Sequence, residues 1–167
     1  FNSHSKQSGF TLPELLGVLA IITIIGVVSF LNFQTSQVKA SDENRKAATR
    51  SMVYALEKYH ADFGVFPPSE VGRIVACGSA TNVSPCRWGL DKFVDLRDSA
   101  YPAYLEVIPG DPQEQKGNSF FYLSNGVDFQ IFASLEQEND PEWSTYVASQ
   151  ELTCGRKVCN YGITLGC

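Results

Sequence analysis

The sequence predicts an α+β fold, in which the second half of a long N-terminal α-helix packs on a small antiparallel β-sheet. Three patterns indicate it: an apolar run near the N-terminus, an amphipathic pattern that continues it, and two alternating segments between turn signals farther on. The chain has 167 residues, enough for one domain and an appended helix. With 44% hydrophobic and 19% charged residues, its composition is that of a folded chain and excludes a disordered one.

The apolar run is long enough to cross a membrane. No charged side chain occurs between Leu15 and Val38, and residues 15–31 read LLGVLAIITIIGVVSFL. A helix that spans a bilayer needs roughly 20 apolar residues. We therefore expect three regions, which are a polar leader over residues 1–9, a hydrophobic membrane or filament-core helix over 10–38, and a globular head over 39–167.

The helix is expected to continue into the head. Apolar residues over positions 38–63 recur at spacings of three and four, and Gly64, with two prolines just beyond it, is a stop signal. The pattern predicts one helix from about Leu12 to Phe63, with residues 39–63 packed on the head. Charged residues lie between the apolar positions, among them Asp42, Arg45 and Lys46.

The sheet is expected in residues 108–167, together with a C-terminal loop. Residues 118–123 (NSFFYL) predict a strand, Ser124-Asn125-Gly126 a turn, and residues 128–136 (DFQIFASLE) a second strand of a hairpin. A third strand is expected either in residues 146–153 or in residues 160–165. Residues 64–107 are expected to form a connecting loop, with a short helix over 99–105.

Five cysteines lie in two regions of the head, and pairs in surface loops of a small exported domain favour disulfides. A metal site is the alternative, but the spacings lack a CxxC pair and no histidine accompanies them. We expect a Cys77–Cys86 disulfide, leave the C-terminal pairing open, and expect one thiol to be free or paired between subunits. The five are Cys77, Cys86, Cys154, Cys159 and Cys167.

Glu14 is an ionisable residue at the edge of the apolar run. A lone charge in a membrane costs several kcal/mol, so this carboxylate needs a partner. A cut between Gly9 and Phe10 would make Glu14 the fifth residue, one helical turn from a new α-amino group. The dipole of a helix N-terminus also favours a carboxylate. Glu14 is therefore the candidate assembly residue, because pairing with an amine of another chain would set the register between helices.

The run GFTLPELL at residues 9–16, followed by an uncharged helix, resembles the class III signal of type IV pilins and pseudopilins. The resemblance implies that a prepilin peptidase cuts between Gly9 and Phe10 and N-methylates Phe10. It also implies that Glu14 neutralises the N-terminal amine of a neighbouring subunit in a homopolymeric helical filament, assembled from the membrane by an inner-membrane platform and an ATPase. The chain departs from many family members in having Leu31 in the region of their helix-breaking proline, which leaves Gly26 as the local weak point.

The loop over residues 136–143 (EQENDPEW) is acidic. Some pseudopilins bind calcium in a loop between the sheet and the tail, and carboxylates are suitable calcium ligands. The spacing here matches no fixed calcium-loop pattern, so we expect a solvated acidic loop, no metal and no cofactor. The weak calcium candidates are Glu136, Glu138, Asp140 and Glu142.

The chain is not expected to be an enzyme. It has two histidines, neither in a recognisable motif, and no GxSxG, glycine-rich phosphate loop or HExxH sequence. A formal net charge of −5, without a Lys/Arg-dense stretch, argues against phosphate-driven binding of nucleic acid. Asn82-Val83-Ser84 is a formal glycosylation sequon.

We expect the structural subunit of a type IV pilus, held in the inner membrane of a prokaryote before assembly and in a cell-surface filament afterwards, with a role in adhesion, motility or DNA uptake. The clustered cysteines favour this interpretation. The alternative is a major pseudopilin of a type II secretion system, which forms a periplasmic pseudopilus. The acidic loop and residues 59–70, which resemble the helix exit of major pilins and pseudopilins, favour that alternative. A third hypothesis is a DNA-receptive or adhesive minor subunit at a filament tip.

Overall fold

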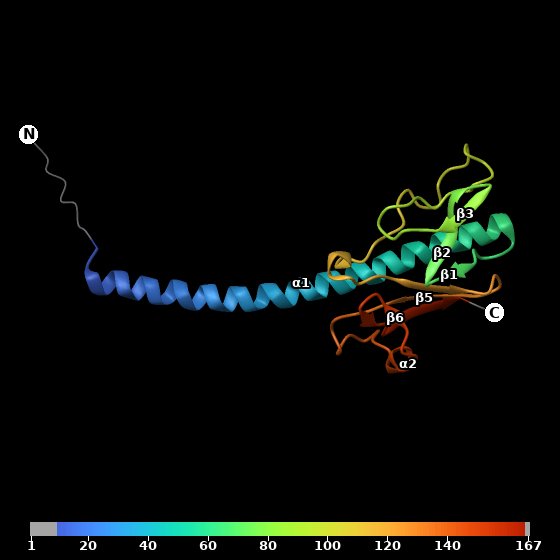
Figure 1. Cartoon of the computed structure of the whole chain (residues 1–167). Helices are drawn as coiled ribbons and strands as arrows, with labels where there is room; N and C mark the ends of the chain where they lie inside the picture. Colours follow the sequence, from blue (N-terminus) through green and yellow to red (C-terminus); the bar gives the residue numbers. More distant parts are fainter. Residues whose placement is uncertain (1–9, 166–167) are drawn as a thin grey trace, which may run out of the picture. The chain divides into compact units, whose positions relative to one another are not determined.

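The computed structural model describes residues 10–165 (Figure 1), so Gly9 and Cys167 lie outside the described residues. It divides into an N-terminal unit that ends at Gln37 and a head unit that begins at Val38, and each is described by itself. Helix α1 (Leu12–Phe63) belongs to both units and confirms the helix predicted from the sequence. In the first unit the described residues from Leu12 onward all belong to α1, whereas in the head α1 packs against strands.

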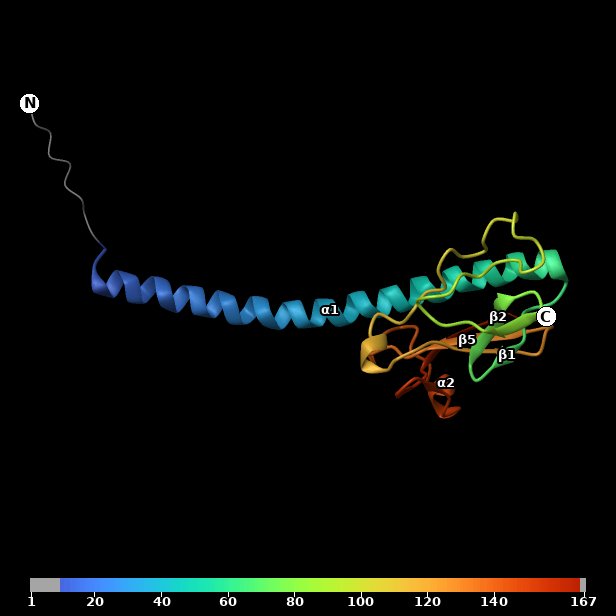
Figure 2. The same cartoon turned by 45° about the horizontal axis from the view of Figure 1, so that its top comes forward.

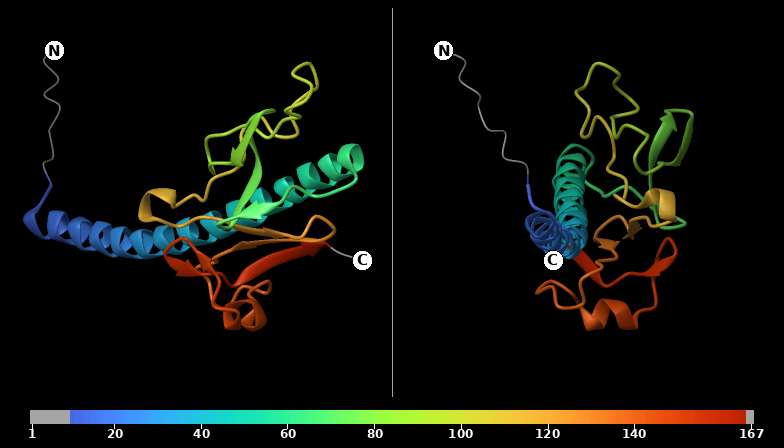
Figure 3. Two further views of the ribbon diagram at one scale, coloured as in Figure 1. Left: turned by 45° about the vertical axis from the view of Figure 1, so that its right-hand side comes forward. Right: turned by 90° about the vertical axis from the view of Figure 1, so that its left-hand side faces the viewer.

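The head contains two three-stranded antiparallel sheets and a two-stranded one. Viewed along α1, the strands and loops gather to one side of its C-terminal half (Figure 3). The sheets have the orders β1-β2-β3, β4-β5-β8 and β6-β7. The strands are β1 (Ser69–Glu70), β2 (Arg73–Ser79), β3 (Asn82–Pro85), β4 (Phe121–Ser124), β5 (Phe129–Ala133), β6 (Thr153–Cys154), β7 (Lys157–Val158) and β8 (Tyr161–Leu165).

The core lies between α1 and the sheets. Met52 and Leu56 of α1 have no exposed surface, and neither has Tyr122 of β4 or Ile131 of β5. Burial of a side chain of this size stabilises the fold by about 1.5–3 kcal/mol. The hydroxyl of Tyr122 donates a hydrogen bond to the carbonyl of Pro67 at 2.9 Å, so the core also fixes the chain just beyond the end of α1.

The predicted hairpin is present as β4 and β5, with Ser124 paired to Phe129. The Asn125 side chain accepts hydrogen bonds from the N–H groups of Val127 and Asp128 at 2.9 and 2.7 Å, which closes the turn. The third strand is β8, so the second of its two expected positions is confirmed. Residues 146–153 were the wrong alternative, because that stretch contains most of helix α2 (Thr145–Ser149). The Ser144 side chain caps this helix by accepting from the N–H of Val147.

The segment between Gly64 and Val107 holds more structure than the expected loop. It contains β1, β2 and β3, and from Cys86 onward it runs beside the C-terminal half of α1 (Figure 2). The ring of Phe93 stacks on Tyr59 with centroids 5.3 Å apart, and the Tyr104 hydroxyl donates to Asp62 at 2.7 Å.

The prediction of a short helix over residues 99–105 is wrong. Tyr104 and Leu105 instead donate backbone hydrogen bonds to the carbonyl of Phe93 at 2.8 and 3.2 Å. Pro102 explains the difference, because it disfavours helical geometry in the residue before it and has no N–H to donate. A 3₁₀ turn, η1 (Glu114–Lys116), follows before β4.

Candidate functional site

The Glu14 side chain caps the start of helix α1. The N–H and the hydroxyl of Thr11 both donate to the same carboxylate oxygen of Glu14 at 3.3 Å, and the N–H of Leu15 donates to the Thr11 carbonyl at 3.1 Å. The Glu14 carboxylate therefore satisfies the N–H of Thr11, a backbone group of the kind that a helix end leaves unpaired. This contact holds the Glu14 carboxylate on the first turn, close in sequence to Phe10, whose side chain is 81% exposed.

The apolar side chains of the described residues in the N-terminal half of α1 are exposed. Among the described residues, α1 is the one helix long and apolar enough to cross a membrane, and its most apolar stretch is not buried. A surface of this kind in a single chain must be covered by lipid or by other chains. The exposed large apolar residues are Phe10, Leu12, Leu15, Leu16, Val18, Leu19, Ile21, Ile22, Ile24, Ile25, Val27, Val28, Phe30 and Phe33.

Two disulfides close short loops of the head. Cys77 of β2 is bonded to Cys86 just after β3, and Cys154 of β6 is bonded to Cys159 just after β7. The Cα atoms are 5.1 Å apart in both. Because these four sulfurs bond to one another, they are not available as metal ligands. Cys167 lies outside the described residues.

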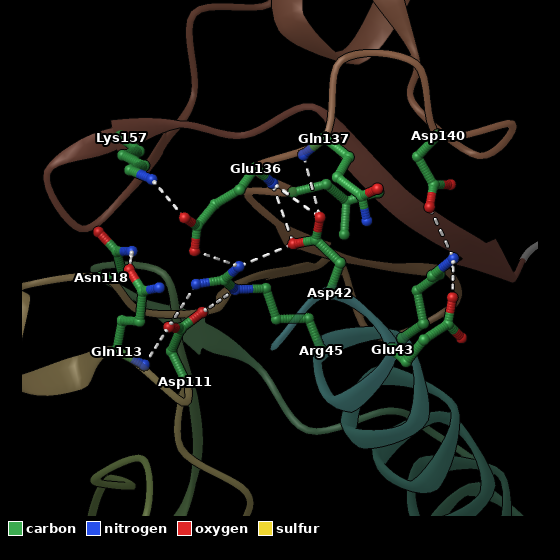
Figure 4. A network of polar contacts seen from close by, with 12 residues as sticks. Asp42, Glu43, Arg45, Asp111, Gln113, Asn118, Glu136, Gln137, Asp140 and Lys157 are labelled. Carbon is green, nitrogen blue, oxygen red and sulfur yellow. Dashed lines mark hydrogen bonds and ion pairs between the residues drawn. The ribbon is translucent and has the colours of Figure 1, made fainter. Parts of the chain in front are cut away.

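A buried charged cluster joins α1 to the sheet and its loops (Figure 4). Arg45 has no exposed surface, and its guanidinium contacts three carboxylates. It donates to both oxygens of Asp111 at 2.8 and 3.1 Å, to Asp42 at 2.8 Å and to Glu136 at 3.0 Å. Burial alone lowers the pKa of Arg45, but the hydrogen bonds and charges of these carboxylates outweigh it and raise the pKa above its ordinary value.

A second cation of α1 binds the acidic loop. The Lys46 ammonium lies 2.9 Å from Asp140, 2.9 Å from Glu43 and 3.6 Å from Glu142. The side chains of Lys46 and Asp140 are each only 6% exposed. Burial works against both charges, yet their mutual contact and the hydrogen bonds around them keep the pKa of Lys46 raised and that of Asp140 lowered.

The backbone of the acidic loop is also fixed. Asp42 accepts hydrogen bonds from the N–H of Glu136 at 3.0 and 3.1 Å and from the N–H of Gln137 at 3.0 Å. Before the loop, the buried Asn160 side chain accepts from the N–H of Leu135 at 2.7 Å and donates to its carbonyl at 2.9 Å. After the loop, the N–H of Ser144 donates to the Asn160 carbonyl at 2.7 Å. Asn160 therefore ties the two ends of the loop together.

Comparison with known proteins connects both parts of the chain to one group. Residues 4–30 match the prokaryotic N-terminal methylation motif. The chain is 28% identical over 121 residues to the type II secretion system core protein G of Vibrio cholerae serotype O1. The aligned residues are 72% of this chain and 73% of the relative. The same protein of Klebsiella pneumoniae is 26% identical over 138 residues, or 82% and 89% of the two chains. No solved structure matches significantly.

The chain belongs to the type IV pilin and pseudopilin family. As a member of this family it is a structural filament subunit and not an enzyme, and its apolar N-terminal helix is typical of inner-membrane prepilins. The core protein G of Pseudomonas aeruginosa, 27% identical over 123 residues, covers 73% of this chain and 77% of its own length. These relatives favour the pseudopilin alternative over the extracellular pilus that the clustered cysteines predict.

The four calcium candidates of this pilin-family head do not form a common site. Glu136 contacts Arg45 and, at 4.0 Å, Lys157, whereas Asp140 and Glu142 contact cations of α1 and Glu138 is exposed. Across residues 10–165, no group of three or more His, Cys, Asp or Glu side chains is placed to hold a metal ion. The expectation of a solvated loop is wrong for Glu136 and Asp140, whose side chains are 18% and 6% exposed.

The charged cluster was not predicted, because in the sequence its members on α1 are only charged residues between the apolar positions of the helix. Positions 42, 45, 46 and 49 continue the three- and four-residue spacing of Met52 and Leu56, so they lie on the same buried stripe. That spacing was the available signal. Charges on a buried stripe require partners from elsewhere in the fold, and the partners Asp111 and Glu136 are too distant in sequence to be recognised.

Proposed function

We propose that this chain is the repeating subunit of a periplasmic pseudopilus in a type II secretion system. The observation that carries the proposal is the extent of the similarity to core protein G, since it covers 72–82% of the chain whereas the methylation motif covers residues 4–30 alone. The likeness therefore extends into the head.

The N-terminal unit supports a mechanism of assembly. In the proposal, a prepilin peptidase cuts between Gly9 and Phe10 and N-methylates Phe10, and the precursor waits in the inner membrane through the apolar half of α1. Polymerisation then exchanges lipid contacts for packing between helices, because the same apolar surface is exposed in the single chain. An inner-membrane platform and an ATPase drive the exchange.

The Glu14 carboxylate is proposed to pair with the α-amino group of Phe10 in a neighbouring subunit. The contact between Glu14 and Thr11 supports this role, because it keeps the carboxylate at the end of the helix where a neighbour's amine can reach it. Moving a lone charge through the membrane is costly, so a paired carboxylate would lower the cost of drawing the helix into a filament.

The proposal is tested by removing the protein from its host and assaying two outputs together. Loss of proteins from the culture medium, with their accumulation in the periplasm and an unchanged amount of sheared surface filament, is the expected result. Loss of surface filaments with normal secretion would instead identify an extracellular pilus. Restoring the wild-type chain should recover secretion, whereas restoring a chain with Glu14→Ala should not.

A further inference from the structure

The acidic loop, residues 136–143, is fastened to α1 by positive charges that belong to the protein. The buried Lys46 ammonium lies 2.9 Å from Asp140 in the middle of the loop, and the buried Arg45 guanidinium lies 3.0 Å from Glu136 at its start. Arg50 adds an exposed contact to Glu142 at 3.2 Å, near the end of the loop. Two successive turns of α1 therefore supply these three cations along the length of the loop, with Arg45 and Lys46 on one turn and Arg50 on the next.

These residues do not fit a calcium ion of the kind that some pseudopilins hold between sheet and tail. Calcium takes about six to eight oxygen ligands at roughly 2.3–2.6 Å. The oxygens of Asp140 and Glu136 that point toward α1 already contact an ammonium and a guanidinium. A divalent ion at the same oxygens would lie beside a buried like charge, where repulsion is weakly screened.

The loop also has no need of a metal to satisfy its backbone. Asp42 accepts from the N–H groups of Glu136 and Gln137, and Asp140 accepts from the N–H of Glu142 at 2.8 Å. The N–H of Trp143 donates to the Asp140 carbonyl at 3.0 Å. The carboxylates that would serve as metal ligands are thus used as hydrogen-bond acceptors within the fold.

We propose that Lys46 and Arg45 perform in this chain the task of a divalent cation, so that the acidic loop is ordered by fixed cations and independently of calcium. Lys46 is the residue that decides this, because its ammonium contacts carboxylates from both α1 and the loop. Arg45 fixes the start of the loop and at the same time joins Asp111 to α1.

The test measures cleavage of the acidic loop in the full chain in detergent micelles. A glutamyl endopeptidase is suitable, since the loop contains Glu136, Glu138 and Glu142, and mass spectrometry locates each cut. In the wild-type chain, the cleavage rate and the thermal midpoint should be the same in excess calcium and in EDTA. A faster cleavage in EDTA that calcium reverses would overturn the proposal, whatever filament the chain forms.

Two variants identify the cation responsible. Lys46→Met keeps the side-chain stem and removes the ammonium, and it should raise the rate of loop cleavage by about tenfold or more, because it leaves buried carboxylate unpaired. Arg50→Met is the matched control, since Arg50 is 61% exposed and also contacts Glu142. Equal rates in the two variants would contradict the role given to Lys46.

A double variant guards against general unfolding of Lys46→Met. Asp140→Asn retains an oxygen that can accept from the N–H of Glu142, while it removes the charge that Lys46→Met leaves unpaired. The combination should therefore restore most of the protection of the loop. If the double variant is cleaved as fast as Lys46→Met alone, charge pairing is not what orders the loop.

Discussion

At the first turn of α1, one carboxylate has two uses. Glu14 accepts hydrogen bonds from the N–H and hydroxyl of Thr11 within its own chain, and the proposed filament requires it to meet an amine of another chain. A carboxylate can accept from several donors at once, so the cap and the amine need not compete. The cap limits the positions of the carboxylate and would reduce the entropy lost on assembly.

Glu14→Ala should leave insertion into the membrane intact and strongly reduce the yield of assembled filament, because it removes the charge that pairs with the amine. Sedimentation of filaments from detergent-treated cells, beside alkaline extraction of membranes, measures both quantities. Thr11→Val is the control for the cap alone: it retains the charge and should cost about 0.5–2 kcal/mol of helix stability at most. Normal filament yield from Glu14→Ala would refute the pairing mechanism.

Arg45 is a cation of the head with no exposed surface, and it contacts three carboxylates. Arg45→Met should destabilise the head by about 3–5 kcal/mol, because breaking a buried ion network leaves its carboxylates uncompensated. Urea unfolding followed by tryptophan fluorescence measures the change. Lys92→Met is the control, since Lys92 and its partner Glu106 are 62% and 74% exposed, and surface pairs of this kind contribute little. Similar losses from both variants would contradict the importance of burial.

Among the elements, the sequence determines α1 best. Its apolar run, its stripe and the stop at Gly64 are all local signals, and the helix occupies Leu12–Phe63 as predicted. The β4–β5 hairpin is equally local, because Asn125 and Gly126 specify the turn. β1 was missed because it is two residues long, and β2 because its residues RIVACGS alternate poorly, so their pairing depends on contacts formed in the fold.

The same distinction separates the predicted parts of the site from the missed ones. Glu14 and the cysteines stand out by residue type and position, whereas two of the three partners of Arg45 lie 66 and 91 residues later. The role of Asn160 was equally hidden, since it joins Leu135 to Ser144 only after β8 has paired with β5. Contacts between residues so far apart in the sequence depend on how the strands and α1 are arranged in the fold, and local sequence patterns do not reveal them.

The two disulfides are expected to differ in their effect on stability. In the chain-entropy account, a disulfide stabilises by restricting the unfolded chain, and more so for a longer loop. Cys77–Cys86 has a sequence separation of 9 and Cys154–Cys159 one of 5. Replacing the first pair by alanine should therefore lower the free energy of unfolding more than replacing the second, with each loss about 2–4 kcal/mol. Thermal unfolding without reductant measures the order, and the reverse order would show that loop length does not decide the difference.

At the scale of the whole head, some buried groups have pKa values far below pH 7 and others far above it. The stability of the head should therefore change little over a broad range around neutral pH. On the acid side, burial opposes ionisation of Asp140, but the N–H of Glu142 and the Lys46 ammonium hold its pKa below the ordinary value of 3.8. Its contribution is therefore present above that value and is lost as the pH falls through the lower pKa of the folded state. On the alkaline side, burial raises the pKa of Tyr104 and of Tyr122 above the ordinary 10.0, and Asp62 adds to the effect on Tyr104.

The neutral phenols of Tyr104 and Tyr122 therefore stabilise the head fully below pH 10.0, and this contribution is lost as the pH rises from there through the raised pKa values of the folded state. The thermal midpoint of the full chain, measured against pH, should be flat at neutral pH and fall on both sides. Tyr104→Phe should make the alkaline fall shallower, because one titrating group is removed. Tyr146→Phe, at a side chain that is 74% exposed, is the control. An alkaline fall as steep in Tyr104→Phe as in the control would show that Tyr104 is not one of the groups that sets the limit.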